Sequence, residues 1–299
     1  MCQIVPRLDE GGVERNAVDV AVAVVKAGGR ALIVSEGGRL VPELLRSGGE
    51  HLEMKLATGG TLARHWLGFK LGRILRQDGF TLVHAFTLAT TALGATAARR
   101  AGARMVATCH GLVQQEQGDS RNWWKPVASA MRVIAASDHV AARLVNEHGL
   151  DADRVVTIPP GINLARFNPA AVKADRFIKL AQRWLLPDGV PLILMPSRLV
   201  RDKGHLGLIE ALTHLENQPF ICLLAGDETV DDGYRAEVEA AITAKGLAGK
   251  VRLVGYCEDM PAAYMLADVV VTPDVVSGAF NRVGAEALAM GRPVIVSDS

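Results

Sequence analysis

Short apolar runs alternate with segments of helical period along the whole chain. In the first half, these runs predict strands at 2–5, 31–35, 81–85, 104–109, 132–136 and 154–158, with helices between them. In the second half, they predict strands at 192–195, 220–225, 251–254, 269–272 and 293–296, and helices at 173–184, 205–215, 231–245, 260–266 and 283–290. This alternation is typical of an α/β protein made of parallel sheets, here as two Rossmann-like halves in tandem.

The segment 158–171, IPPGINLARFNPAA, separates the two halves. It holds Pro159, Pro160, Gly161 and Pro169, which together prevent a regular element. We therefore predict an N-terminal domain at 1–160, a linker at 161–172 and a C-terminal domain at 173–299. Such domains bind ligands at the carboxyl ends of their strands, so we expect two facing sheets with the site in the cleft between them.

Composition narrows the class of protein. Apolar residues make up 49% of the 299 residues and charged residues 22%, as in soluble globular proteins. No apolar run reaches the roughly 18 to 20 residues of a membrane span. The N-terminus, MCQIVPRLDEGG, lacks the features of a signal peptide, so we expect a cytoplasmic protein. The cysteines show no CxxC spacing and are interpreted as buried apolar side chains (Cys2, Cys109, Cys222, Cys257).

Charge is unevenly divided between the halves. Residues 1–165 hold 19 Lys and Arg against 15 Asp and Glu, a balance of +4. Residues 166–299 hold 14 against 17, a balance of −3. The first half is therefore the better candidate to meet an anionic surface.

The stretch LILMPSRLVRDKG (192–204) places cations directly after an apolar strand. Arg198 and Lys203 lie five positions apart around a turn, and Gly204 lets the chain enter the next helix. An arginine fork and a lysine point charge can together neutralise one diphosphate. A solvated basic turn is the alternative interpretation of this motif taken alone.

The order of motifs along the chain carries more information than any one of them. It runs LDEGGVERNAVDVAVAV, ATCHG, IPPGINLARFNP, SRLVRDKG, LLAGDE, VRLVGYCEDMPAAYMLADVVVTPD and GAFNRVGAEALAMGRPVIVSD. Together these motifs resemble the family 4 retaining glycosyltransferases of GT-B fold, over almost the whole chain. The resemblance implies two Rossmann-like domains and sugar transfer from a nucleoside diphosphate sugar.

The resemblance also assigns roles to residues of the second half. Arg198 and Lys203 match the pair that grips the donor diphosphate, and Glu286 matches the acid that receives the ribose hydroxyls. A carboxylate can accept hydrogen bonds from two vicinal hydroxyl groups at once. Because the neighbours of Glu286 are small or apolar, we expect its carboxylate to have a hydrogen-bonding partner. The loop YCED, with Glu258, is expected to border the nucleotide base.

In the first half, three residues match the family's motifs. Gly11 and Gly12 resemble its glycine loop, where the backbone can approach the donor phosphate or the acceptor. His110 resembles the histidine near the transferred sugar. Taken alone, such a histidine is more often structural than catalytic.

The chain departs from the family pattern at one acidic position. The family commonly carries two glutamates separated by seven residues, but the position eight before Glu286 is Gly278. Asn281 stands where a glycine is usual. The missing acid normally helps hold hydroxyls of the sugar, so Ser277 and Asn281 are interpreted as neutral substitutes in donor binding.

The sequence thus predicts a retaining hexosyltransferase-type glycosyltransferase acting on an acceptor hydroxyl. By resemblance, the leaving diphosphate helps deprotonate the acceptor and no protein nucleophile is needed; no Ser/His/Asp set is found. No metal-ligand spacing is found, so neither metal nor cofactor is expected. Two alternatives stay open. The chain could be a nucleotide-sugar epimerase, or a relative of the family that binds sugar nucleotides without turning them over. No nucleic-acid partner is expected.

The segment 61–79, TLARHWLGFKLGRILRQDG, predicts a basic amphipathic helix with Arg64, Lys70, Arg73 and Arg76 among apolar residues. Such a helix can lie on an anionic bilayer and bring the site to a lipid-linked acceptor. This favours a role in cell-envelope polysaccharide or lipopolysaccharide biosynthesis, peripheral to the inner face of the membrane. A core-facing helix with a solvated basic face is the alternative.

The sequence ends at RPVIVSDS, directly after a predicted parallel strand. The resemblance implies further sheet and helix beyond this point, so we expect an incomplete C-terminal domain. It should expose apolar surface around Val294, Ile295 and Val296.

Overall fold

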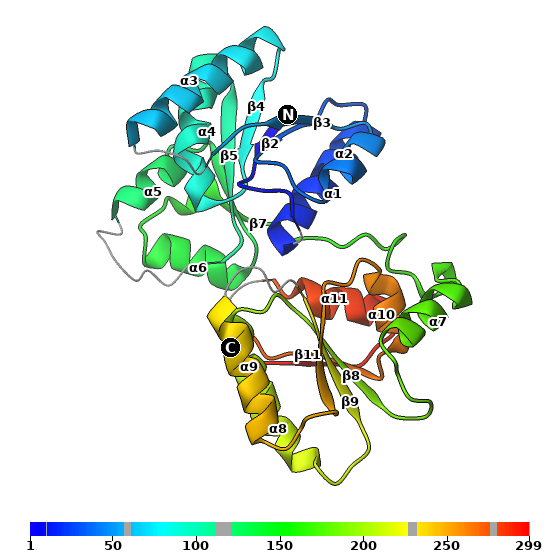
Figure 1. Ribbon diagram of the computed structural model, residues 1–299. Coiled ribbons are helices and arrows are strands. Elements are labelled where there is room, and N and C mark those ends of the chain that lie inside the picture. The colour runs from blue at the N-terminus through cyan, green and yellow to red at the C-terminus, as the bar shows by residue number, and fades with distance from the viewer. Residues whose placement is uncertain (10, 57–60, 112–120, 227–231, 276–279, 299) are drawn as a thin grey trace. The chain divides into compact units, whose positions relative to one another are not determined.

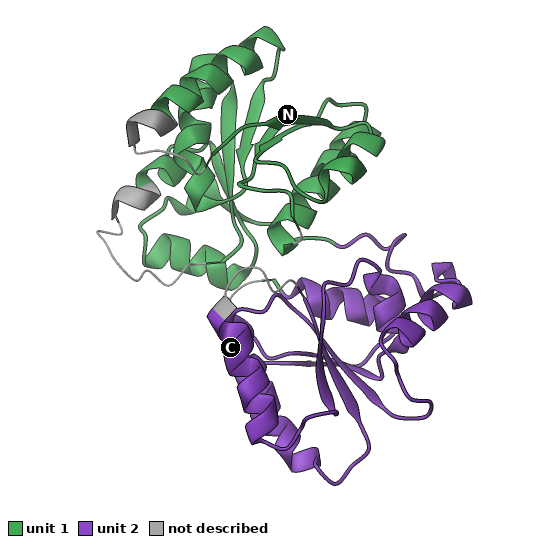
Figure 2. Cartoon of the chain, viewed as in Figure 1, with its two compact units in different colours: residues 1–161, 278–280 green, residues 162–277, 281–299 purple. Residues whose placement is uncertain are grey.

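The computed structural model describes residues 1–9, 11–56, 61–111, 121–226, 232–275 and 280–298. The chain divides into two compact units (Figure 2). Unit 1 comprises residues 1–161 with 278–280, and unit 2 comprises residues 162–277 with 281–299. Each unit holds a parallel β-sheet with helices on both faces (Figure 1), which confirms the predicted α/β class.

Among the residues described in unit 1, seven strands form a sheet in the order β3-β2-β1-β4-β5-β6-β7. The strands are β1 Cys2–Ile4, β2 Leu32–Ser35, β3 Glu50–Glu53, β4 Leu82–Ala85, β5 Arg104–Cys109, β6 Arg132–Ala135 and β7 Val155–Thr157. The helices are α1 Gly12–Lys26, α2 Val41–Arg46, α3 Thr61–Gln77, α4 Leu88–Ala101, α5 Arg121–Ala128 and α6 Asp138–Asn146, with a 3-10 turn at Ala152–Arg154. Because every strand pair is parallel, all the strands end at the same edge of the sheet.

Unit 2 repeats this plan with five described strands in the order β10-β9-β8-β11-β12. They are β8 Leu192–Pro196, β9 Ile221–Ala225, β10 Val251–Gly255, β11 Val269–Thr272 and β12 Val294–Val296. The helices are α7 Ala174–Arg183, α8 His205–Leu212, α9 Asp232–Ala244, α10 Met260–Leu266 and α11 Arg282–Ala289, with 3-10 turns at Pro169–Ala171, Arg201–Lys203 and Thr213–Leu215.

Strand β8 shows why the central strands of unit 2 are largely apolar. Leu192 and Leu194 pack into the core under α7, α10 and α11, whereas Ile193 and Met195 pack under α8 and α9. Successive side chains of a strand point to opposite faces, and helices cover both faces here. A continuous apolar run is therefore the signature that a buried parallel strand requires.

Strands β3 and β12 each lie at the edge of their sheet. Strand β3, EHLE, was not predicted because it is polar; it pairs with β2 at the edge of the sheet, where charged residues are tolerated. At the opposite end of the chain, Ile295 and Val296 of β12 are 59% and 53% exposed. This confirms the expected apolar surface there.

Helices α3 and α4 pack closely because α3 carries two glycines one turn apart. A Cβ added at Gly68 would lie 2.7 Å from Cβ of Thr96, and one at Gly72 would lie 2.6 Å from Cβ of Arg100. Neither neighbouring atom is the end of a flexible side chain, so a larger residue would push the two helices apart.

We therefore expect Gly68→Val to lower the free energy of unfolding by about 1–3 kcal/mol through overpacking. Gly207→Ala in α8 is the control, since nothing lies within 4 Å of the added Cβ. That substitution should be neutral or stabilising by up to about 1 kcal/mol, because alanine favours a helix more than glycine does. Urea denaturation of both variants tests this, and equal stability of the two would contradict the packing argument.

Candidate functional site

The turn between β8 and α8 places the two cations that the sequence analysis singled out. Arg198 is exposed, two residues beyond the end of β8. Lys203 ends a 3-10 turn, and its Nζ donates a hydrogen bond to Oδ1 of Asp274 over 3.1 Å. Asp274 lies 71 residues further along the chain, just after β11, so no sequence spacing indicated this contact.

Gly204 is required where this turn meets the segment after β11. Its φ is +76°, and an added Cβ would lie 1.9 Å from the carbonyl oxygen of Pro273. Close by, the backbone N–H of Val275 donates to the carbonyl of Asp202 over 2.9 Å. The turn that carries Lys203 is therefore fixed against the end of β11 by its backbone.

The third cation of the turn, Arg201, contacts helix α9. Its Nη2 lies 2.6 Å from Oε2 of Glu237, and its guanidinium carbon lies 4.9 Å from the ring centre of Tyr234. Both partners belong to α9, so Arg201 ties the turn to that helix.

Glu286 is buried on α11 and has hydrogen-bonding partners, as we expected. Nε of Arg282 donates to Oε1 over 2.9 Å, and the Tyr264 hydroxyl donates to Oε2 over 3.1 Å. Burial raises the pKa of the Glu286 carboxyl, although both hydrogen bonds and the Arg282 charge oppose the rise. The sequence analysis missed Arg282, whose spacing of four residues from Glu286 could have indicated the pair.

Asn281 has a local role as the N-cap of α11. Its Oδ1 accepts from the backbone N–H of Gly284 over 2.8 Å, and its Nδ2 donates to Oγ1 of Thr272 over 2.5 Å. Both ends of the amide are thus used within unit 2, and its role toward a donor stays a prediction. Ser277 and Gly278 lie outside the described residues.

Glu258 is exposed in the loop that follows β10. Its neighbour Asp259 holds the loop, since it forms an ion pair with Arg176 at 2.6 Å and caps α10 through Ala262 N. Strand β10 is separated from β8 by β9. The loop therefore lies at the same edge of the sheet as Lys203, two strands away.

The glycines of unit 1 begin helix α1. Gly11 is the N-cap, with an extended backbone at φ −114° and ψ 166°, and Gly12 is the first helical residue and is exposed. A Cβ at Gly11 would meet the carboxylate of Glu14, the mobile end of a side chain. Neither a left-handed backbone nor a fixed neighbour therefore requires glycine at position 11.

His110 follows β5 and stacks on Phe86, with ring centres 5.8 Å apart. Its Nε2 is buried and has no hydrogen-bond partner within the described part of the chain. Burial lowers the pKa of the His110 imidazole to about 4, so the ring is neutral at pH 7. The neighbouring His84 bonds Oγ1 of Thr108 over 2.7 Å, and burial lowers its pKa to about 3.

The predicted residues thus form two sets, each at the carboxyl edge of one sheet. Unit 2 holds Arg198, Lys203, Glu258, Asn281 and Glu286. Unit 1 holds Gly11 after β1 and His110 after β5, with β4 between these two strands.

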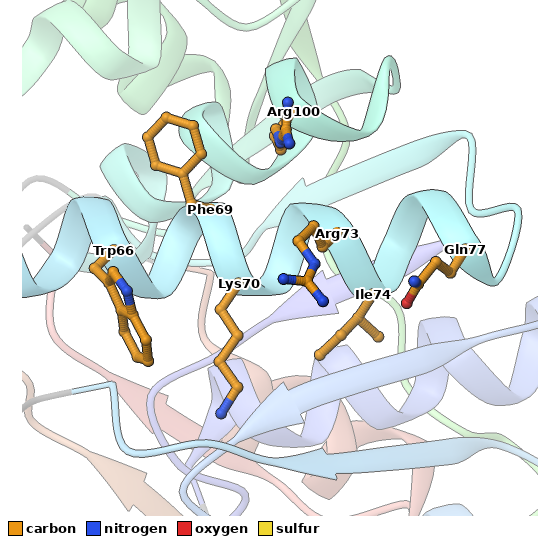
Figure 3. A pocket seen from close by; sticks show the side chains of 7 residues that line it. All are labelled: Trp66, Phe69, Lys70, Arg73, Ile74, Gln77 and Arg100. Carbon is orange, nitrogen blue, oxygen red and sulfur yellow. The ribbon is translucent and has the colours of Figure 1, made fainter.

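A separate hollow lies on the outer face of α3 (Figure 3). We call it the α3 surface, and it is lined by Trp66, Phe69, Lys70, Arg73, Ile74, Gln77 and Arg100. Trp66 is 65% exposed and Phe69 51% exposed, and none of the seven lining residues is acidic. The opposite side of α3 carries the fully buried Leu71 and Leu75.

Comparison with known proteins assigns the chain to a family. Residues 10–166 match the model "Glycosyltransferase Family 4", and residues 177–299 match the model "Glycosyl transferases group 1". The chain therefore belongs to the family 4 glycosyltransferases, as the order of its motifs indicated.

Two relatives in sequence are bacterial. A D-inositol 3-phosphate glycosyltransferase of Xylanimonas cellulosilytica is 30% identical over 255 residues, which are 80% of this chain and 60% of that protein. The putative glycosyltransferase EpsF of Bacillus subtilis is 28% identical over 244 residues, 75% of this chain and 59% of its own length. The chain thus spans about 60% of the length of these relatives.

Solved structures confirm the GT-B fold. A glycosyltransferase from Rickettsia africae superposes with a TM-score of 0.86 at 29% identity, over 99% of this chain and 78% of that one. Anabaena Alr3699/HepE in complex with UDP-glucose gives 0.84 at 22% identity, over 100% and 80%. At that identity the second likeness shows the fold alone.

The buried histidines make stability depend on pH. Burial lowers the pKa of His205 to about 4 and that of His84 to about 3, from an ordinary 6.5. Below pH 6.5 the unfolded chain binds protons that the folded chain does not, so the free energy of unfolding falls as the pH is lowered toward 4. The slope should approach about 1.4 kcal/mol per pH unit for each such group. Urea denaturation of wild type and His205→Gln at several pH values tests this, and the variant should show a shallower decline. Parallel declines would show that His205 does not contribute.

Proposed function

We propose that the chain transfers a hexose from a nucleoside diphosphate sugar to an acceptor hydroxyl, with retention of configuration. The observation that carries the proposal is the fixed turn that sets Arg198 and Lys203 at the carboxyl end of β8, beside the strand that leads to α11 and Glu286. Membership of the family supports it. So does a relative of the same fold that was solved with UDP-glucose.

In this proposal the residues of unit 2 hold the donor. Arg198 and Lys203 neutralise the diphosphate and stabilise its charge as the sugar bond breaks. Glu286 receives the ribose hydroxyls, because a carboxylate has about four lone-pair sites and, within the described residues, Tyr264 and Arg282 each donate to one of its oxygens. Glu258 borders the base, and Asn281 keeps α11 in place.

The residues of unit 1 act near the transferred sugar. The backbone at Gly11 and Gly12 approaches the donor phosphate or the acceptor. The neutral His110 offers to a sugar hydroxyl its Nε2, which has no hydrogen-bond partner among the described residues. The leaving diphosphate takes the acceptor proton, so no protein nucleophile is required. We propose that neither a metal nor a cofactor takes part.

The acceptor is proposed to be a cell-envelope glycan or lipopolysaccharide precursor, reached at the inner face of the membrane. Within the described residues, no helix is long and apolar enough to cross a bilayer. The α3 surface supports a peripheral contact with one face of the membrane. It combines exposed Trp66 and Phe69 with Lys70, Arg73 and Arg100, and such a mixture binds anionic bilayers through both insertion and charge. Trp66 and Phe69 lie three positions apart on one helix beside these cations, and this grouping of apolar and basic side chains favours the membrane contact over a merely solvated helix face.

Incubation with a panel of nucleoside diphosphate sugars, with and without an acceptor extract, tests the proposed reaction. A glycosyltransferase consumes donor in proportion to acceptor and forms a glycosylated product. An epimerase converts donor without acceptor, and a relative without turnover binds donor and converts none. Either of these two results would overturn the proposal.

Arg198→Ala and Lys203→Ala should each weaken nucleoside diphosphate binding roughly tenfold or more. Each variant loses a charge-assisted hydrogen bond, typically about 1.5–3 kcal/mol. Arg201→Ala is the matched control, because this cation of the same turn pairs with Glu237. Calorimetric titration measures the affinities, and equal losses in all three variants would remove the specific role of Arg198 and Lys203.

The membrane contact is tested by vesicle sedimentation. The wild type should pellet with phosphatidylglycerol vesicles and stay in solution with phosphatidylcholine vesicles. Replacing both Lys70 and Arg73 by glutamine should weaken binding about tenfold or more, since each cation near an anionic surface contributes about 1 kcal/mol. The control is Lys26→Gln with Arg46→Gln, which removes the same charge from exposed positions of unit 1. If the two double variants lose binding equally, only net charge matters and the α3 surface is not the site.

A further inference from the structure

The Lys203–Asp274 ion pair occupies the position where the proposed function requires a free cation. The Nζ–Oδ1 distance is 3.1 Å, and the two side chains are only 28% and 30% exposed. Partial burial reduces the screening of such a pair by solvent. A diphosphate that binds Lys203 must therefore share it with, or take it from, a carboxylate already in place.

The carboxylate is the fixed partner of the pair. The carbonyl of Asp274 accepts a hydrogen bond from Oγ of Ser297 over 2.7 Å, and the next residue, Val275, donates its N–H to Asp202 on the turn. On the other side, the carbonyl of Pro273 lies against Gly204. Asp274 has a short side chain on this anchored backbone, whereas Lys203 has a long flexible one.

The two partners also differ in what they contribute to an anionic ligand. Lys203 attracts a diphosphate, and the Asp274 carboxylate competes with that diphosphate for the Lys203 ammonium group. The other two charged residues of the turn are placed differently. Asp202 is exposed, and Arg201 is paired with Glu237 of α9. Among the described residues, the carboxylate paired with Lys203 is therefore that of Asp274.

We propose that Asp274 is a positioning residue that holds Lys203 in the unliganded protein and limits affinity for the diphosphate product, which promotes its release. The inference rests on the proposed role of Lys203 in donor binding. It concerns regulation of that site by a built-in competitor of the ligand. Product release limits turnover in many enzymes, so a carboxylate that weakens product binding can benefit the reaction.

The test uses the chain with Asp274→Asn, which keeps shape and removes the charge. Inorganic pyrophosphate and UDP are the probes, titrated by calorimetry, and UDP dissociation is followed by stopped flow. We expect both anions to bind about tenfold tighter than to wild type, UDP to leave about tenfold more slowly, and uridine to bind unchanged. Asp274→Glu, which restores the charge, should bind close to wild type.

Two controls separate this role from a general charge effect. Asp202→Asn removes the same charge from the same turn and should change affinity less than about twofold. In a Lys203→Gln background, Asp274→Asn should have no further effect, because the effect of Asp274 acts through Lys203. An effect that persists in that background overturns the proposal, as does an unchanged or weaker affinity in Asp274→Asn.

The outcomes also separate this inference from the proposed function. If wild type and Asp274→Asn bind UDP equally, the donor site stands and the role of Asp274 is wrong. If wild type, Asp274→Asn and Asp274→Glu bind neither UDP nor pyrophosphate, the donor site itself is wrong, and the role of Asp274 falls with it.

Discussion

The close approach of the β8–α8 turn to the end of β11 is the constraint on which the arrangement of unit 2 depends. Only a glycine fits at position 204, because a Cβ there would overlap the carbonyl oxygen of Pro273 and the backbone is left-handed. This contact joins two neighbouring parallel strands at their carboxyl ends. It sets Lys203 beside Asp274, which follows β11. Thr272, the last residue of β11, in turn accepts a hydrogen bond from Asn281 at the start of α11. The cations and the carboxylate are therefore presented from one rigid edge.

The polar groups at this edge are held with different strengths, and the difference matches their proposed roles. Glu286 is buried and fixed by Arg282 and Tyr264, as a group that recognises a constant part of a ligand should be. Arg198 is exposed, and Lys203 is half-buried and paired. Groups that must bind and release a charged product benefit from this weaker restraint.

In unit 1, burial rather than a neighbouring charge sets the protonation state of His110. The low pKa of His110 keeps its ring neutral, so the ring can donate or accept a hydrogen bond without presenting a charge to the ligand. Three cations of this unit, Lys70, Arg73 and Arg100, instead line the α3 surface, where Gly72 of α3 lets Arg100 of α4 approach. Close helix packing thus adds a cation of α4 to the basic face of α3.

The sequence by itself determined the α/β class and nearly all the strands, because apolar periodicity is a local property. Motif order singled out Arg198 and Lys203 as the proposed donor-site cations. It also indicated that Glu286 needs a partner. Only the tertiary structure decided which partner, and it alone revealed β3 and Asp274. Strand β3 forms because β2 offers it an edge, and Asp274 meets Lys203 because β8 and β11 are neighbours in the sheet. Sheet pairing joins residues far apart in the chain, and no local pattern records which strands will lie side by side.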